Sequence, residues 1–304
     1  MKNVVNVQAM LRTHHAYKFM KNIRGSPAFW NSVLLDLLAM VRQLGIPTWF
    51  LTLSAADMQW PEVIRSIAHQ YGTYLTDDDV KNMSWEQKCK WLRSNPVTAA
   101  RQFNHRLNLF FKEVIGGQCH PIGELQDYMI RIEFQARGSP HAHTILWMKN
   151  APKVGVDSDE DVINFINQHQ TCTIPDEKED DLRQLVLSLQ KHVHSKTCRR
   201  NGLCRFRFPH PPSKHTIIGR PSTETDATMV TKELQAKEDV LRKVRTIMED
   251  KNTSPDISLE NLLQKAKVNQ HEYQQALKLT RSGEQIILKR QPSESTSITL
   301  IPRS

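Results

Sequence analysis

Two histidines one residue apart, His141 and His143, stand at the start of an apolar run in the stretch SPHAHTILW. This run, and the stretch YMIRIEFQ before it, are rich in β-branched and aromatic residues, which predicts strands over 141–148 and 128–135. Side chains two residues apart share one face of a strand. The two imidazoles are therefore expected to lie on the same face of a sheet.

The intervening ARGSP is predicted to be a five-residue hairpin loop, which pairs Gln135 with His141 and Glu133 with His143. Opposed residues of antiparallel strands have Cβ atoms about 4.5–5.5 Å apart. Imidazole nitrogens and a carboxylate suit a divalent first-row ion, so these four residues form a candidate metal site. The alternative is a pair of strand histidines satisfied by hydrogen bonds, since so short a motif often occurs by chance.

A second candidate metal site lies in HVHSKTCRRNGLC. Its nitrogen and sulfur ligands are His192, His194, Cys198 and Cys204. Such ligands suit tetrahedral zinc, although their spacing is not that of a standard zinc finger. The alternative is two buried, reduced cysteines beside solvated histidines.

The net charge of +9 favours a polyanionic partner such as nucleic acid. Cations interleaved with Phe206 and Phe208 suit single-stranded DNA, where phosphates meet Lys or Arg and bases stack on rings. The alternative places both phenylalanines in the core, with the arginines in solvent. The residues expected to contact DNA are Arg131, Arg137, Lys196, Arg199, Arg200, Arg205 and Arg207.

The elements that position these groups follow from apolar spacing and capping signals. Helices are predicted over 27–44, from Pro61, and over 97–115, and WFLTLS at 49–54 predicts a short strand. The acidic segment 153–182 is predicted to be loop-like. The order of helix, strand, helices and hairpin predicts an α+β fold with a central antiparallel sheet flanked by helices.

Composition excludes several classes of protein. The 304 residues are 39% hydrophobic and 24% charged, which is typical of a soluble globular chain. The longest apolar runs are too short to span a bilayer, so no membrane partner is expected. The N-terminus has no apolar signal region, and five scattered cysteines do not form a disulfide framework, which together predict a reducing compartment.

The character of the chain changes after RFRFPHPPS. Residues 1–220 are predicted to form a core domain that includes the Cys/His and basic segment at 192–212, and 221–304 a polar helical extension. The last stretch, SESTSITLIPRS, is low in complexity and is expected to be frayed or truncated.

Three stretches together resemble the N-terminal Rep-like domain of Helitron transposases, also called the Helitron helicase-like domain. They are FLTLSAADMQWPE (50–62), EFQARGSPHAHTILW (133–147) and CRFRFPHPP (204–212). The resemblance runs from about Leu11 to Arg290 and implies an HUH endonuclease that nicks single-stranded DNA and transfers the strand in rolling-circle transposition. It also implies a nuclear protein whose full-length relatives have a C-terminal helicase domain in the same polypeptide.

The resemblance further implies a mechanism. A divalent ion, Mg²⁺ or Mn²⁺, would be held by His141, His143 and either Glu133 or Gln135, and would polarise the scissile phosphate. A tyrosine hydroxyl would then attack, forming a phosphotyrosine and leaving a free 3′-hydroxyl. FLTLS is interpreted as the strand that braces the sheet beneath this site, and each of its residues individually as core.

The nucleophile departs from the family pattern, which has two tyrosines a few residues apart on a helix after the histidines. Only Tyr273, in VNQHEYQQALK, follows the histidines at any distance, and it is expected to be an exposed helix residue rather than the nucleophile. The chain is therefore expected to stop short of the tyrosine helix, and no catalytic residue is assigned. Whether it is an enzyme stays open: it is a nicking domain or a catalytically inactive nucleic-acid-binding remnant. No GxxxxGK[ST] loop is present, so helicase activity is not expected.

Overall fold

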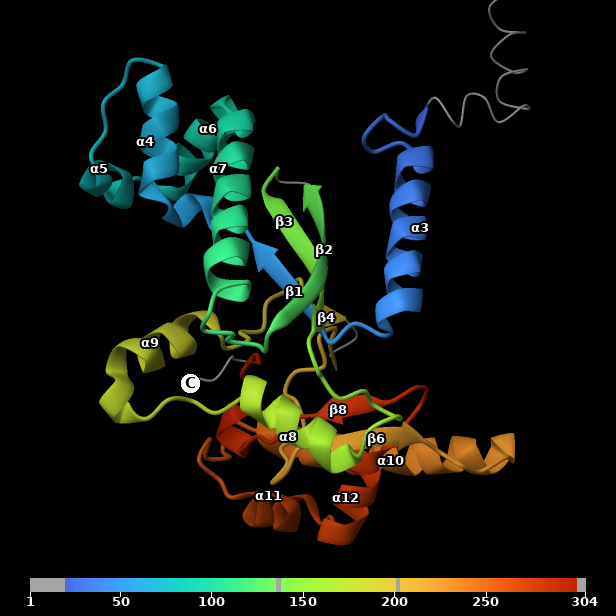
Figure 1. Cartoon of the computed structure of the whole chain (residues 1–304). Coiled ribbons are helices and arrows are strands. Elements are labelled where there is room, and N and C mark those ends of the chain that lie inside the picture. Colours follow the sequence, from blue (N-terminus) through green and yellow to red (C-terminus); the bar gives the residue numbers. More distant parts are fainter. Residues whose placement is uncertain (1–19, 135–137, 201–202, 300–304) are drawn as a thin grey trace, which may run out of the picture. The chain divides into compact units, whose positions relative to one another are not determined.

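The computed structural model describes residues 20–134, 138–200 and 203–299 (Figure 1). The chain divides into two compact units, residues 1–151 and 152–304, which are considered separately. No helix among the described residues is long and apolar enough to cross a membrane.

The first unit is built on a three-stranded antiparallel sheet in the order β1-β3-β2. Its strands are β1 (Trp49–Ser54), β2 (Leu125–Phe134) and β3 (Pro140–Met148). On the central strand, the side chains of Ala142, Thr144 and Leu146 are completely buried. Because side chains alternate, His141 and His143 point to the opposite, more open face.

Helices flank this sheet, which confirms the predicted α+β fold. They are α3 (Pro27–Leu44), α4 (Pro61–Gln70), α5 (Asp77–Asn82), α6 (Trp85–Ser94), α7 (Pro96–Leu109), the 3₁₀ turn η1 (Asp57–Gln59) and the π-helical segment η2 (Phe110–Ile115). Phe111 of η2 covers the buried face of the sheet, with its ring 5.0 Å from that of Tyr128. Helices α4 to α7 enclose a core of their own around Ile64 and Ile67.

Local capping chemistry explains where these helices begin. Ser26 caps α3 by accepting a hydrogen bond from the backbone of Phe29, directly before Pro27. Helix α6, which the apolar pattern did not predict, begins with a reciprocal capping box between Ser84 and Gln87.

The second unit combines helices with two small sheets. Its elements are α8 (Asp159–His169), η3 (Glu177–Glu179), α9 (Asp180–Leu189), β4 (Arg199–Arg200), β5 (Leu203–Cys204), β6 (Ile217–Pro221), α10 (Ala227–Glu249), α11 (Leu259–Ala266), α12 (Gln270–Lys278), β7 (Leu279–Thr280), β8 (Gln285–Ile287) and η4 (Pro292–Glu294). The predicted boundary near residue 220 falls inside this unit, because β6 pairs with the later strands β7 and β8. Helices α10, α11 and α12 pack around a shared apolar core.

The prediction that residues 153–182 are loop-like is wrong for α8. Its acidic residues all lie in the first turn, where they favour the positive end of the helix dipole. Val162 and Ile166, one helical turn apart, are buried. The helix is therefore amphipathic. Its apolar side is short and is preceded by three acidic residues, so apolar spacing in the sequence does not reveal it.

The segment after β8 is not frayed over its described part, because a buried arginine organises it. Arg290 Nη1 donates to the carbonyl oxygens of Glu294, Ser295 and Ser297, and Nη2 to the Cys172 sulfur at 2.9 Å. Burial lowers the pKa of the Arg290 guanidinium and raises the pKa of the Cys172 thiol. The side chain of Ser297 is completely buried.

We expect Arg290→Met to weaken the second unit by about 2 kcal/mol or more, because three buried carbonyl groups would lose a charged donor. Hydrogen exchange of residues 290–298, followed by mass spectrometry, should accelerate. Arg242→Met is the matched control, since Arg242 is exposed and, among the residues that the structure describes, forms an ion pair with Asp239 of its own helix alone. Equal exchange in the two variants would contradict this role of Arg290.

Candidate functional site

The strand register brings a carboxylate to the two histidines, but not through the predicted pairing. Glu133 lies opposite His141, and Arg131 lies opposite His143. The predicted partner of His141, Gln135, lies outside the described residues. The predicted register is thus shifted by two residues, which leaves every side chain on its predicted face.

The physical reason for the shift is the position of Pro140. This residue is the first of β3 and pairs with Phe134, so the five-residue connection is 135–139 rather than 136–140. Proline lacks an N–H group but is accepted at the first position of a strand. Its carbonyl still accepts a hydrogen bond, from the backbone N–H of Ala55.

His143 contacts both Glu133 and His141 on this surface, which we call the HxH face. Glu133 Oε2 lies 3.1 Å from His143 Nε2, a diagonal cross-strand contact. The imidazole rings of His141 and His143 have centroids 4.6 Å apart. Two imidazoles and a carboxylate are a suitable donor set for a divalent ion.

Strand β1 contributes two residues to the HxH face that the sequence did not identify. Ser54 Oγ lies 2.7 Å from His141 Nδ1. The Phe50 ring is 66% exposed and stacks beside that of His143, with centroids 5.9 Å apart and planes 22° apart. The interpretation of FLTLS as core is therefore wrong for its outward positions, which strict alternation along the strand could have revealed.

Helix α3 borders the same face. The guanidinium of Arg131 lies over the Trp30 ring, 4.5 Å from its centroid. At the other end of the face, the indole N–H of Trp147 donates to the carbonyl of Gly45, directly after α3. The cation–π contact with Trp30 therefore holds the Arg131 guanidinium on the strand position opposite His143. The other arginine expected in this region, Arg137, lies outside the described residues.

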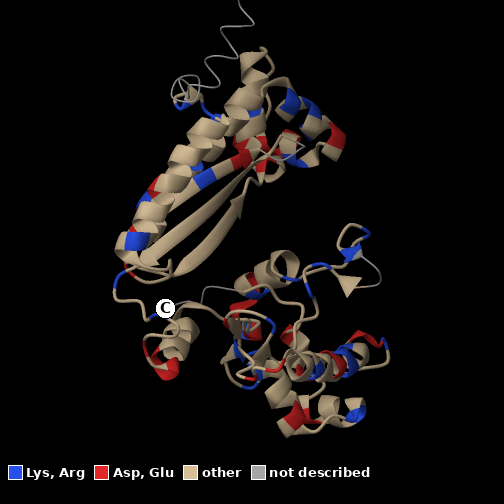
Figure 2. Cartoon of the chain, turned by 90° about the vertical axis from the view of Figure 1, so that its right-hand side faces the viewer, with Lys and Arg blue, Asp and Glu red and all other residues tan. Residues whose placement is uncertain are grey.

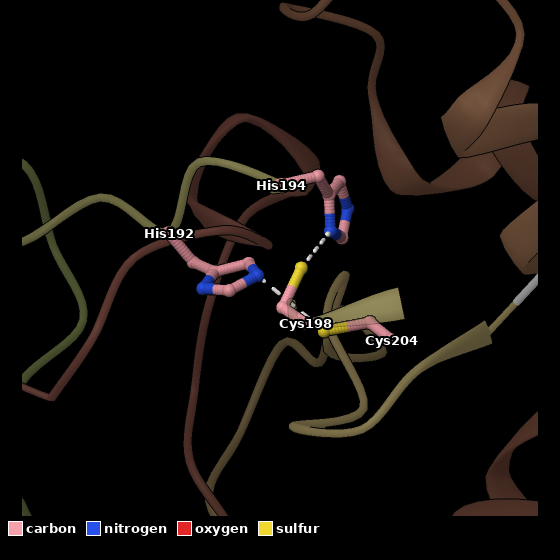
Figure 3. A group of neighbouring side chains, drawn as sticks. All are labelled: His192, His194, Cys198 and Cys204. Atoms are coloured by element: carbon pink, nitrogen blue, oxygen red, sulfur yellow. Dashed lines mark hydrogen bonds between the residues drawn. The ribbon is translucent and has the colours of Figure 1, made fainter. Parts of the chain in front are cut away.

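The structure brings together all four residues of the second candidate site (Figure 3). In Figure 3, His192 and His194 point toward the cysteine sulfurs of Cys198 and Cys204. Their ligand atoms all lie within 4.8 Å of one another. Among the described residues this is the one group of three or more His, Cys, Asp or Glu whose ligand atoms converge so closely. The cluster is therefore a candidate metal centre.

Local hydrogen bonding prepares the cluster for a metal. The backbone N–H of Ser195 donates to Cys198 Sγ, and this interaction lowers the pKa of the Cys198 thiol. Burial, followed by the charge of His194, lowers the pKa of His192. Both shifts favour the forms that bind metals, thiolate and neutral imidazole.

The basic segment around the cluster has one buried and one exposed phenylalanine. Phe208 is 9% exposed and stacks on His192, so its interpretation as core is correct. Phe206 is 49% exposed, and the guanidinium of Arg205 lies over its ring. The core interpretation is therefore wrong for Phe206.

Residues 4–146 match the family model described as "Helitron helicase-like domain at N-terminus". This segment is therefore similar to Helitron helicase-like domains. The match contains the HxH motif and ends at Leu146, so the Cys/His cluster lies outside it. No curated protein and no solved structure matches the chain. The similarity to Helitron domains supports a transposase-related function that involves nucleic acid.

None of the described tyrosines contacts a residue of the HxH face. Tyr128 is on the opposite side of the sheet against Phe111, and Tyr71 donates to the carbonyl of Ser94. Tyr273 belongs to the second unit and is 1% exposed, so the expectation of an exposed residue is wrong. Its hydroxyl donates to the carbonyl of Pro212 at 2.8 Å, and burial raises its pKa.

We expect Tyr273→Phe to lower the stability of the second unit by about 1–2 kcal/mol, because the buried Pro212 carbonyl would lose its donor. Hydrogen exchange of α12 measures this loss. The variant should leave binding and covalent capture of single-stranded DNA unchanged. A DNA–protein adduct that forms with the parent chain and disappears in Tyr273→Phe would contradict the structural role of this tyrosine.

Proposed function

We propose that the first unit binds single-stranded DNA and a divalent ion at the HxH face, as the metal-holding part of a Helitron-type nicking and strand-transfer domain. The observation that carries this proposal is that His141, His143 and Glu133 are neighbours on one open sheet face within the Helitron-matched segment. The resemblance to Helitron Rep domains makes Mg²⁺ or Mn²⁺ the expected ion, and the two imidazoles favour Mn²⁺ of these two.

The residues around the histidines support metal binding through their orientation. A Ser54 hydroxyl that accepts a hydrogen bond from Nδ1–H leaves the Nε2 lone pair of His141 available as a ligand. At His143 the carboxylate lies beside Nε2 itself, 3.1 Å away, so Glu133 Oε2 and His143 Nε2 would act as neighbouring ligands of one ion. A divalent ion bound here supplies Lewis-acid polarisation of a phosphate oxygen.

Two further groups on the HxH face suit a DNA strand. Arg131, stacked on Trp30, presents a cation to a phosphate. Phe50 presents an exposed ring beside His143, on which an unpaired base can stack. Phosphate and base contacts on either side of the histidines would hold the strand across them.

A second candidate function is nucleic-acid binding without cleavage. The positions of Tyr71, Tyr128 and Tyr273 favour it, since none presents a hydroxyl to the HxH face. Incubation of the chain with single-stranded DNA and Mn²⁺ separates the two functions: covalent adducts support nicking, whereas metal-dependent binding without adducts supports the binding function.

We expect His141→Ala combined with His143→Ala to weaken Mn²⁺ binding by at least tenfold, because two imidazole ligands are removed. Isothermal titration of Mn²⁺ into the full chain measures this affinity. Cys204→Ser is the matched control, since it removes a ligand of the other cluster and should leave this binding intact. Equal Mn²⁺ affinity in the parent and the double variant would contradict the metal assignment.

We expect Phe50→Ala to weaken binding of single-stranded DNA by about tenfold, because one stacked base contributes about 1–3 kcal/mol. Phe50→Trp should retain binding, and Phe50→Leu should not, since stacking requires a ring. Tyr74→Ala, which removes an 82% exposed ring that packs against His69 of α4, is the control for the loss of any surface aromatic. Fluorescence anisotropy of a labelled oligonucleotide gives the affinities. Equal losses in Phe50→Ala and Tyr74→Ala would contradict base stacking on Phe50.

A further inference from the structure

The Cys/His cluster belongs neither to the HxH face nor to the Helitron-matched segment. We propose that His192, His194, Cys198 and Cys204 hold one zinc ion, and that this ion fixes the β4–β5 hairpin as a second binding platform for single-stranded nucleic acid. The platform is formed by the hairpin, the segment before it and Phe206.

Two sulfur–nitrogen separations in the cluster match those of tetrahedral coordination, and all four ligand atoms lie within 4.8 Å of one another. Zinc–sulfur bonds of about 2.3 Å and zinc–nitrogen bonds of about 2.0–2.1 Å place adjacent sulfur and nitrogen ligands about 3.5 Å apart at the tetrahedral angle. The corresponding distances are 3.4 Å between Cys204 Sγ and His192 Nε2, and 3.6 Å between Cys198 Sγ and His194 Nδ1. Four protein ligands fill the coordination shell, as in structural rather than catalytic zinc sites.

Groups outside the cluster fix the orientation of its ligands. The Ser195 N–H donates to Cys198 Sγ at 3.2 Å, and His192 stacks on Phe208 with ring planes 11° apart. The backbone N–H of Arg205 donates to the carbonyl of Cys198 at 2.7 Å. This bond continues the pairing of β4 with β5, so Cys198 directly precedes one strand and Cys204 lies on the other. Such outer contacts are typical of metal sites, where they reduce the cost of arranging the ligands.

The hairpin has little else to hold it in place. Strands β4 and β5 contain two residues each, and a hairpin of this size is not stable in water by itself. The nearby apolar side chains of Val193 and Leu203 are 81% and 58% exposed, so they bury little surface. A metal that joins the hairpin to residues 192–194 supplies the missing constraint.

The segment around the cluster is rich in basic residues, and Figure 2 colours Lys and Arg blue along the chain. The sequence has no acidic residue between Asp181 and Glu224. Lys196, Arg199 and Arg205 are exposed, and none of them forms an ion pair with a carboxylate of the described residues. Zinc with two thiolates is neutral overall, so a metal-loaded cluster leaves this charge available for phosphates.

Phe206 indicates that the partner is single-stranded. Its half-exposed ring lies 5.8 Å from that of His192 and beneath the Arg205 guanidinium, 4.5 Å away. An exposed ring among cations can stack on an unpaired base while the cations contact the backbone. Bases in a duplex are already stacked on their neighbours, so the ring discriminates between the two forms of nucleic acid.

The metal is tested on the full chain by elemental analysis after removal of unbound zinc. We expect one zinc ion per chain in the parent, in Cys119→Ser and in His194→Cys, where a thiolate replaces an imidazole. Cys204→Ser should lose the ion. Substitution with Co²⁺ should give the visible absorption of a tetrahedral thiolate site. A folded parent chain without stoichiometric zinc overturns the site.

Alkylation provides a measure that does not depend on how Cys204→Ser folds. With the parent chain, iodoacetamide should modify Cys198 and Cys204 only after a chelator is added. The exposed Cys119 should react both before and after, which makes it an internal control. Equal modification of Cys198 and Cys204 with and without chelator overturns the site.

The platform is tested with Phe206→Ala, which removes no zinc ligand. We expect zinc content to be unchanged and the affinity for single-stranded oligonucleotides to fall about tenfold, with recovery in Phe206→Trp. Arg205→Gln should reduce the slope of log K against log salt by about 0.7. Unchanged affinity in Phe206→Ala, or equal affinity of the parent for a duplex of the same sequence, overturns the platform.

The contributions of the two sites to DNA affinity are distinguished by measuring the effect of Phe206→Ala in a variant that already carries His141→Ala and His143→Ala. We expect the same tenfold loss there, because the platform does not depend on the HxH face. A loss that disappears in this background would show that Phe206 acts only through the HxH site, and would overturn the second platform.

Discussion

The alternation of side chains along β3 is the constraint on which the first unit depends. Ala142, Thr144 and Leu146 are completely buried on one side of this central strand, so the residues between them must face the other side. A shift by one residue would bury both histidines and expose three core side chains, which would strongly lower the free energy of unfolding of the unit. The core of the sheet thereby specifies the chemistry of its open face, because Ser54, Glu133 and Arg131 reach the histidines only in this register.

The second unit relies less on apolar burial in the region that follows α9. There, a buried arginine binds successive backbone carbonyls, and a Cys/His cluster joins a two-residue hairpin to the preceding segment. The helices α10 to α12 have a conventional apolar core, and Tyr273 belongs to it. Polar interactions of this kind specify one arrangement strongly, because an unsatisfied buried donor or carbonyl costs more than a lost apolar contact.

Apolar periodicity predicted the strands of the HxH hairpin and helices α3, α4 and α7. Helices α4 and α7 and strand β3 bury a regular stripe of side chains, whereas α3 buries only Ala28 and leaves Leu34, Leu35 and Leu38 exposed. Periodicity missed α6 and α8, whose short apolar stripes are surrounded by charge. It placed the hairpin loop one residue too late, because Pro140 can stand in a loop or begin a strand.

The two metal-ligand groups could be identified from residue types, but their contacts could not. Spacing along the chain does not show that Ser54 reaches His141, because 87 residues separate them. Nor does it distinguish Phe206 from Phe208, which lie two residues apart yet differ in exposure. Tyr273 shows the same limit: its polar neighbours suggest exposure, whereas tertiary packing buries it.

The most direct test of the central claim is pulsed electron paramagnetic resonance of Mn²⁺ bound to the full chain. If His141 and His143 are ligands, the spectrum should contain hyperfine couplings from imidazole nitrogen. These couplings should be retained in Cys204→Ser and be absent when both histidines are replaced by alanine. A spectrum without directly coordinated nitrogen, or one that the histidine substitutions leave unchanged, would contradict the account of the HxH face as a metal site.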